Sequence, residues 1–163
     1  MAQASRSDRD LRRTLRLYLV TDPELCSRHG LLATVRDAVR GGVSVVQLRD
    51  KTATTSALVK MGRDLAVILD DTGVPLVVND NVEAAIAIGA NGIHVGQDDM
   101  KVEEVRRLVG PDMIIGLSCE TVEDARKTPT DVVDYIGVSP VFATQTKTDH
   151  SLAVGIDGLR AIS

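Results

Sequence analysis

The sequence predicts an α/β fold, and within that class a (β/α)8 TIM barrel of which this chain carries about six βα units. Short runs dense in β-branched and aliphatic residues alternate with longer segments of helical period, which is typical of parallel strands joined by helices. No G-x-G-x-x-G follows the first predicted strand, where Thr21-Asp22-Pro23-Glu24 stands instead. An open dinucleotide-binding sheet is therefore disfavoured, and the barrel is the better prediction.

The predicted elements follow one another in a regular order. Strands are predicted at 17–21, 43–48, 75–78, 92–95, 113–117 and 132–138. Helices are predicted at 31–40, 54–71, 82–88, 102–108, 121–127 and 155–163. Gly89 is expected to end one helix, and Thr121, with Asp124 three residues later, to cap another. Residues 17–163 thus form one incomplete barrel domain, preceded by a polar, arginine-rich tail at 1–16.

Composition narrows the range of partners. The net charge is −4 and aromatic residues make up only 2%, so neither general attraction to nucleic acid nor a base-stacking surface is expected. No run approaches the roughly 20 apolar residues of a membrane span. Cys26 and Cys119 match no metal-ligand spacing and are expected to be reduced thiols. These features predict a cytoplasmic protein with small-molecule partners.

Polar and charged residues gather after the predicted strands, at the end where a barrel of this kind assembles its active site. From the second strand to the sixth they are Gln47, Arg49, Lys51, Asn79, Asp80, His94, Gln97, Asp98, Asp99, Ser118, Ser139, Thr144, Thr146 and Lys147. Chance loop polarity would scatter such residues to both ends of the strands. Their placement therefore predicts one shared binding site.

Arg49 and Lys51 lie two apart at a strand end, so their side chains can project to the same side and converge on one anion. The charge of a departing diphosphate is stabilised by fixed cations together with a divalent ion. Asp80 and Asp99 follow adjacent strands and suit the octahedral oxygen coordination of Mg²⁺. This pair contains no histidine, which disfavours zinc.

Each of these residues also has an ordinary structural interpretation. Arg49 can form a surface ion pair with Asp50. Asp80 can cap a helix or close an Asx turn, and Asp99 can be simple loop acidity. Their joint placement favours the binding site over these alternatives.

His94 and Cys119 are not expected to be catalytic. His94 stands between Ile93 and Val95 in an apolar strand, which favours a hydrogen-bonded histidine that orients its neighbours over a general base. Cys119 has no histidine close in sequence to activate it, and buried thiols are usually inert.

Several motifs resemble, in order and spacing, those of the thiamine-phosphate synthase family. They are Leu17-Tyr18-Leu19-Val20-Thr21-Asp22, Gln47-Leu48-Arg49-Asp50-Lys51, Val78-Asn79-Asp80, His94-Val95-Gly96-Gln97-Asp98-Asp99, Gly116-Leu117-Ser118 and Thr144-Gln145-Thr146-Lys147. The resemblance extends from about residue 17 to the last residue. It implies a transferase that joins a pyrimidine diphosphate to a thiazole phosphate and releases diphosphate.

The resemblance also implies site roles. The substrate-binding residues would be Gln47, Leu48, Arg49, Asp50, Lys51, Asn79, Ser118, Thr144, Gln145, Thr146 and Lys147. Among them Arg49, Lys51, Ser118 and Lys147 would be catalytic, and Asp80 and Asp99 would hold Mg²⁺. The implied reaction is dissociative: diphosphate leaves, a pyrimidine methylene cation forms, and the thiazole nitrogen attacks it. The cations and the metal would stabilise the departing charge without a protein nucleophile.

Two departures from the family pattern are visible. Asn81 stands where the family often has arginine, which removes one positive charge near the metal site. The family's seventh and eighth strands, which help to hold the thiazole phosphate, have no counterpart within the 163 residues. Six strands would leave open edges, so we expect a fragment that self-associates and is weakly active or inactive. The alternatives are a thiazole tautomerase-like relative and a non-catalytic binding module.

Overall fold

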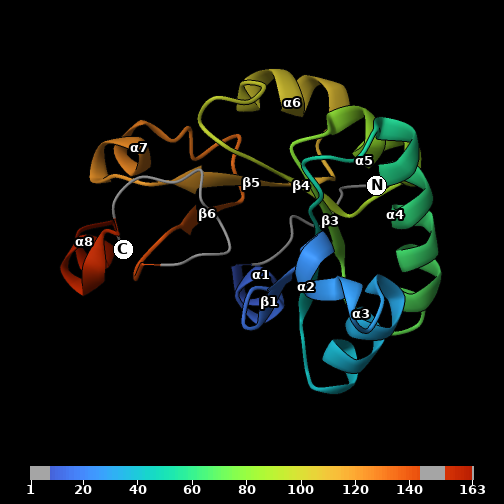
Figure 1. Cartoon of the computed structure of the whole chain (residues 1–163). Helices are drawn as coiled ribbons and strands as arrows, with labels where there is room; N and C mark the ends of the chain where they lie inside the picture. Colours follow the sequence, from blue (N-terminus) through green and yellow to red (C-terminus); the bar gives the residue numbers. More distant parts are fainter. Residues whose placement is uncertain (1–7, 144–152, 163) are drawn as a thin grey trace. The chain divides into compact units, whose positions relative to one another are not determined.

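The computed structural model describes residues 8–143 and 153–162 of the chain, in which helices alternate with strands (Figure 1). The chain divides into two compact units, Met1–Gly92 and Ile93–Ser163, and each is described by itself. Every pair of strands with a described register is parallel. The α/β class is therefore confirmed, whereas closure into a (β/α)8 barrel stays a prediction.

The N-terminal unit contains three strands and five helices within its described residues. Its elements are α1 (Asp8–Thr14), β1 (Tyr18–Val20), α2 (Pro23–Ser27), α3 (Leu31–Arg40), β2 (Val45–Leu48), α4 (Thr55–Leu69), β3 (Leu76–Asn79) and α5 (Val82–Ile88). The strand order is β1-β2-β3. Val20 pairs with Gln47, and Gln47 pairs with Val77, so the ends of the three strands lie next to one another.

The core of this unit follows from the distribution of apolar residues. All four residues of β2 are buried, as expected for a parallel strand covered on both faces. Helix α4 contacts both α3 and α5 (Figure 1). A Cβ on Gly62 of α4 would overlap the side chain of Ile88 in α5. Glycine at this position therefore allows the two helices to approach closely.

The C-terminal unit carries the remaining described elements. They are β4 (Gly92–Val95, whose first residue ends the N-terminal unit), α6 (Val102–Val109), β5 (Ile114–Cys119), α7 (Val122–Lys127), β6 (Tyr135–Val138) and α8 (Gly155–Ile162). The strand order is β4-β5-β6, and Ser118 of β5 pairs with Gly137 of β6. Helix α7 contacts α8 (Figure 1).

The expected helix caps are present. Gly89 has a φ of 73° and ends α5 in the left-handed conformation that favours glycine. Thr121 accepts a hydrogen bond from the backbone N–H of Asp124, whose side chain accepts one from the Thr121 backbone in return. This capping box satisfies two of the amide groups at the start of α7.

Two short helices were not predicted from the sequence. Helix α1 lies in the stretch that was expected to be a polar tail, and α2 follows β1 directly. Asp22 caps α2 by accepting from the backbone N–H groups of Glu24 and Leu25, and Pro23 opens the helix. In the part of the chain that is described, no helix combines the length and apolar character needed to cross a membrane.

Candidate functional site

Gln47 and Arg49 lie at the end of β2 and are held by residues from β1 and its following loop. Gln47 is only 4% exposed, and its amide donates to the Tyr18 hydroxyl at 2.8 Å. The buried Thr21 hydroxyl accepts from the Arg49 backbone N–H at 3.0 Å and donates to the Arg49 carbonyl at 3.4 Å. The backbone from which the Arg49 side chain extends is thus fixed on both sides.

Asp50 shapes the loop that follows. Its Oδ1 accepts from the backbone N–H of Thr52 at 2.9 Å, from the Thr52 hydroxyl at 2.8 Å and from the backbone N–H of Ala53 at 3.1 Å. Partial burial alone would raise the pKa of this carboxyl, but the hydrogen bonds from Thr52 and Ala53 outweigh it and lower the pKa. Asp50 is therefore a loop-forming residue beside Lys51.

Asp80 follows β3 in a strained conformation, with a φ of 59° that few residues other than glycine adopt. Its carboxylate lies 3.9 Å from the Lys51 ammonium. The next residue, Asn81, caps α5 by accepting from the Ala84 N–H at 2.8 Å, and its amide donates to Thr55 at 3.0 Å. Asn81 thus ties α5 to the start of α4.

Ser118 is the centre of the polar group in the C-terminal unit. Its hydroxyl lies 2.9 Å from His94 Nε2, and His94 Nδ1 lies 3.0 Å from the Tyr135 hydroxyl. The Ser118 carbonyl accepts from the Gln97 amide at 2.6 Å. His94 is 9% exposed and both of its ring nitrogens have hydrogen-bond partners, so the expected hydrogen-bonded histidine is present, whereas its role in orienting its neighbours stays a prediction.

Asp99 and Cys119 are two further ionisable residues of the C-terminal unit, and each has a hydrogen-bond partner. The Asp99 carboxylate accepts from the Gly96 backbone N–H at 2.7 Å, which fixes the side chain within its own turn. Burial raises the pKa of the Cys119 thiol above its usual value, and the Thr128 hydroxyl 3.6 Å away opposes this only in part. A thiol of this kind is poorly nucleophilic.

The structure describes most of the residues predicted to form the site. In the N-terminal unit, the ends of neighbouring strands β2 and β3 hold Gln47, Arg49, Asp50, Lys51, Asn79 and Asp80. In the C-terminal unit lie Asp99 and Ser118. Leu48 is 1% exposed, so its side chain belongs to the core. Thr144, Gln145, Thr146 and Lys147 lie outside the described residues.

Sequence reasoning missed Tyr18 and Thr21 in the N-terminal unit and Tyr135 in the C-terminal unit. Each one holds a predicted site residue or its partner: Gln47, Arg49 and His94, respectively. Thr21 had a usable signal, because it follows the first strand at the same end as the other candidates. Tyr135 had only a weak signal, a hydroxyl in the mainly apolar predicted strand 132–138, which also contains Asp134.

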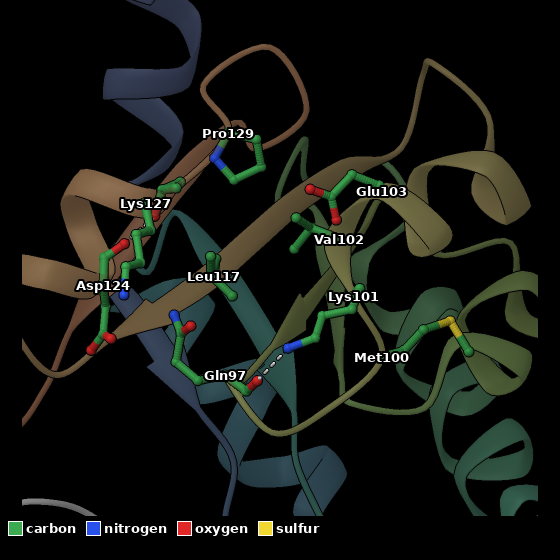
Figure 2. A pocket seen from close by; sticks show the side chains of 11 residues that line it. Gln97, Met100, Lys101, Val102, Glu103, Leu117, Asp124, Lys127 and Pro129 are labelled. Carbon is green, nitrogen blue, oxygen red and sulfur yellow. Dashed lines mark hydrogen bonds between the residues drawn. The ribbon is translucent and has the colours of Figure 1, made fainter.

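A separate cavity of about 230 Å³ lies within the C-terminal unit (Figure 2). Leu117 lines it, and since successive strand residues point to opposite faces, the cavity lies on the face of β5 away from the Ser118 side chain. Lys101, Glu103, Asp124 and Lys127 give its rim a mixture of charges. Of the polar residues predicted for the shared binding site, Gln97 lines this cavity, whereas the described residues assigned to the substrates or to the metal do not.

Parallel strands followed by helices, with cations, amides and carboxylates after the strand ends, define an α/β protein suited to a small anionic ligand. A family model described as thiamine monophosphate synthase matches residues 17–163. The chain therefore belongs to the thiamine monophosphate synthase family.

Named relatives agree with this assignment. The chain is 48% identical over 144 residues to a thiamine-phosphate synthase from Azorhizobium caulinodans, covering 88% of this chain and 68% of the relative. It is 45% identical over 163 residues to one from Albidiferax ferrireducens, covering 99% of this chain and 74% of the relative. A solved thiamine phosphate pyrophosphorylase from Pyrococcus furiosus matches with a TM-score of 0.82 at 32% identity, covering 93% of this chain and 71% of that one.

Proposed function

We propose that this chain is a thiamine-phosphate synthase, a transferase that joins 4-amino-2-methyl-5-(diphosphooxymethyl)pyrimidine to 4-methyl-5-(2-phosphooxyethyl)thiazole and releases diphosphate. The observation that carries the proposal is the group of cations, amides and a carboxylate at the ends of β2 and β3, including the Lys51 ammonium 3.9 Å from Asp80. Family membership and the names of its relatives support this reaction.

The N-terminal unit supports the diphosphate part of this proposal. The Arg49 side chain extends from a backbone fixed by Thr21, and Lys51 extends from a loop fixed by Asp50. Preorganised cations stabilise developing negative charge without a cost of reorganisation at the moment of reaction. We assign Arg49 and Lys51 to the diphosphate, with Gln47 and Asn79 as amide partners of the same substrate.

Magnesium fits the donor groups that are present. In the described part of the chain no three His, Cys, Asp or Glu residues gather at one place as metal ligands. Mg²⁺ is commonly held by one or two carboxylates, with substrate phosphates and waters as its other ligands. We propose Asp80 and Asp99 for this role. When bound, the ion would supply charge stabilisation to the departing diphosphate.

The remaining assignments extend the proposal to other residues. Ser118 is assigned to the pyrimidine diphosphate as a hydroxyl donor, and Lys147 as a third cation. Thr144 and Thr146 are assigned to the thiazole phosphate, with Gln145 beside them. Cys26 and Cys119 are free and buried, which is typical of a reducing compartment, so we place the enzyme in the cytoplasm.

The test is diphosphate release by the whole chain with both substrates and Mg²⁺. We expect product that requires both substrates and the metal, and a loss of roughly 100-fold in Asp80→Ala, since removing one preorganised charge-stabilising group costs about that much. Asp64→Ala is the matched control, because Asp64 is an aspartate of α4 whose carboxylate pairs with the exposed Lys60.

Three other results would contradict the proposal. Isomerisation of the thiazole alone would identify a tautomerase. Binding of the pyrimidine diphosphate without any turnover would identify a binding module. Equal activity of wild type and Asp80→Ala would remove Asp80 from the site.

A further inference from the structure

Three side chains from three strands of the C-terminal unit form one hydrogen-bonded chain. Tyr135 of β6 contacts Nδ1 of His94 in β4 at 3.0 Å, and Nε2 of the same ring contacts the Ser118 hydroxyl of β5 at 2.9 Å. Because His94 is 9% exposed, water competes little for either ring nitrogen. The two ends of the ring therefore link the tyrosine to the serine.

The backbone leaves room for these three hydrogen-bonded side chains. Gly116 of β5 lies opposite Tyr135 in the strand register, and a Cβ there would overlap both the Tyr135 ring and His94 Nδ1. A Cβ on Gly137 of β6 would lie 3.1 Å from the His94 ring. Two positions without side chains, one on each strand, thus make room for the histidine and the tyrosine.

The chemistry of the three groups gives the chain a direction. A neutral imidazole has one nitrogen that donates and one that accepts. Only one of the two hydroxyls can donate to the single accepting nitrogen. A phenol is more acidic than an aliphatic hydroxyl and is therefore the stronger donor, so the favoured arrangement has the Tyr135 O–H donating to Nδ1. The Nε2–H of His94 then donates to the Ser118 oxygen. This leaves the hydroxyl proton of Ser118 to donate to a further acceptor.

We propose that Tyr135 is a positioning residue: acting through His94, it fixes the Ser118 hydroxyl as a hydrogen-bond donor toward the anionic part of the diphosphate substrate. The identity of that acceptor rests on the proposed function. The direction of the hydrogen bonds rests on the observed contacts and on the chemistry of the three groups, and it does not depend on the proposed function. With the opposite histidine tautomer, Ser118 would donate its proton to His94. Its oxygen would then present only lone pairs to the substrate anion, and these would repel the anion.

The first test is a mutant cycle on the whole chain. Tyr135→Phe removes the hydroxyl and keeps the ring, whose centroid lies 5.5 Å from that of His94. We expect kcat/KM for the pyrimidine diphosphate to fall about 3- to 10-fold, as for loss of one hydrogen bond. Ser118→Ala should lose at least as much, and the double variant should match Ser118→Ala alone. Independent losses that multiply in the double variant would overturn the proposal.

The second test needs no turnover. The sequence contains three histidines, and the nitrogen resonances of ¹⁵N-histidine-labelled protein distinguish the two tautomers, with His94→Gln identifying the signals. We expect His94 to carry its proton on Nε2 in the wild type and to lose this preference in Tyr135→Phe. A proton on Nδ1 in the wild type, or an imidazolium, would overturn the inference.

The two tests separate this inference from the proposed function. If the wild type releases no diphosphate, the proposed function fails, and the tautomer measurement still decides the direction of the chain. If Tyr135→Phe does not fold, the wild-type tautomer alone decides it.

Discussion

Thr21 shows how much one buried hydroxyl can organise. It is 3% exposed, and it accepts from the backbone N–H of Arg49 and donates to the carbonyl of the same residue. A buried backbone group that loses its partner costs more than a hydrogen bond is worth. The hydroxyl therefore influences both the stability of the strand end and the placement of the Arg49 side chain.

We predict that Thr21→Val, which preserves the shape of the side chain, lowers the free energy of unfolding by roughly 1–3 kcal/mol, because it leaves the Arg49 N–H unsatisfied. Denaturant unfolding measures this. Thr34→Val is the control, since the Thr34 hydroxyl donates to the carbonyl of Gly30, the residue before α3, in an exposed hydrogen bond. It should change stability by less than about 0.5 kcal/mol. Equal effects of the two substitutions would contradict this role of Thr21.

Asp50 leads to a prediction about how the stability of the fold depends on pH. Because hydrogen bonds from Thr52 and Ala53 lower the pKa of its carboxyl below the usual 3.8, the ionised form stabilises the folded state. That contribution is complete above pH 3.8 and is lost as the pH falls through the lowered pKa. We expect the difference in Tm between wild type and Asp50→Asn to be larger at pH 6 than at acid pH. A difference that does not change with pH would show that the carboxylate contributes nothing.

At the residue scale, the sequence predicted which polar residues follow the strands better than it predicted their hydrogen-bond partners. Arg49, Lys51 and Asp80 could be predicted because all strand ends of a parallel sheet share one edge. The bond from Tyr135 to His94 could not, since it depends on strand register and on the space beside Gly116. Asp50 was predicted to bind substrate, and the structure gives it a role in shaping the loop.

At the element scale, Arg106 holds the end of α6 against two strands. Its guanidinium donates to the carbonyls of Gly110, Met113 and Val132 at 2.7–2.9 Å, and to the Asp134 carboxylate at 2.9 Å. Asp134 in turn accepts from the backbone N–H of Ile115 at 2.8 Å. One side chain thus connects a helix end, the loop before β5 and the start of β6.

We predict that Arg106→Ala lowers the free energy of unfolding by about 2–4 kcal/mol, since it removes several hydrogen bonds and leaves a partly buried carboxylate without its cation. Arg107→Ala is the matched control, because Arg107 is the exposed neighbour on the same helix. Equal stability of the two variants in denaturant unfolding would show that the Arg106 contacts add nothing.

The predictable elements were those with a long periodic pattern. Helices α3 and α5 begin and end where the sequence predicted them. Strand β6 starts at Tyr135 rather than at residue 132, because the N–H groups of Val132 and Val133 bond to the Pro129 carbonyl in a turn. Helix α2 has only five residues, too few to show a period. Its available signals were the cap residue Asp22 and Pro23 at the first helical position.

At the scale of the whole molecule, each unit holds its own polar group. In the N-terminal unit two cations and a carboxylate follow neighbouring strands, and in the C-terminal unit Ser118 is held by both its hydroxyl and its carbonyl. Rigid support of this kind is what a site for a multiply charged phosphate ester requires. The central claim is that the first of these groups binds the diphosphate.

Calorimetric titration of the whole chain with the pyrimidine diphosphate in the presence of Mg²⁺ tests that claim most directly. Lys51→Gln should weaken binding about tenfold or more, because a charge-assisted contact to the ligand is lost. Lys60→Gln, which removes an exposed lysine of α4 paired with Asp64, should leave the Kd unchanged. If Lys51→Gln binds as tightly as the wild type, the diphosphate does not bind at the ends of β2 and β3.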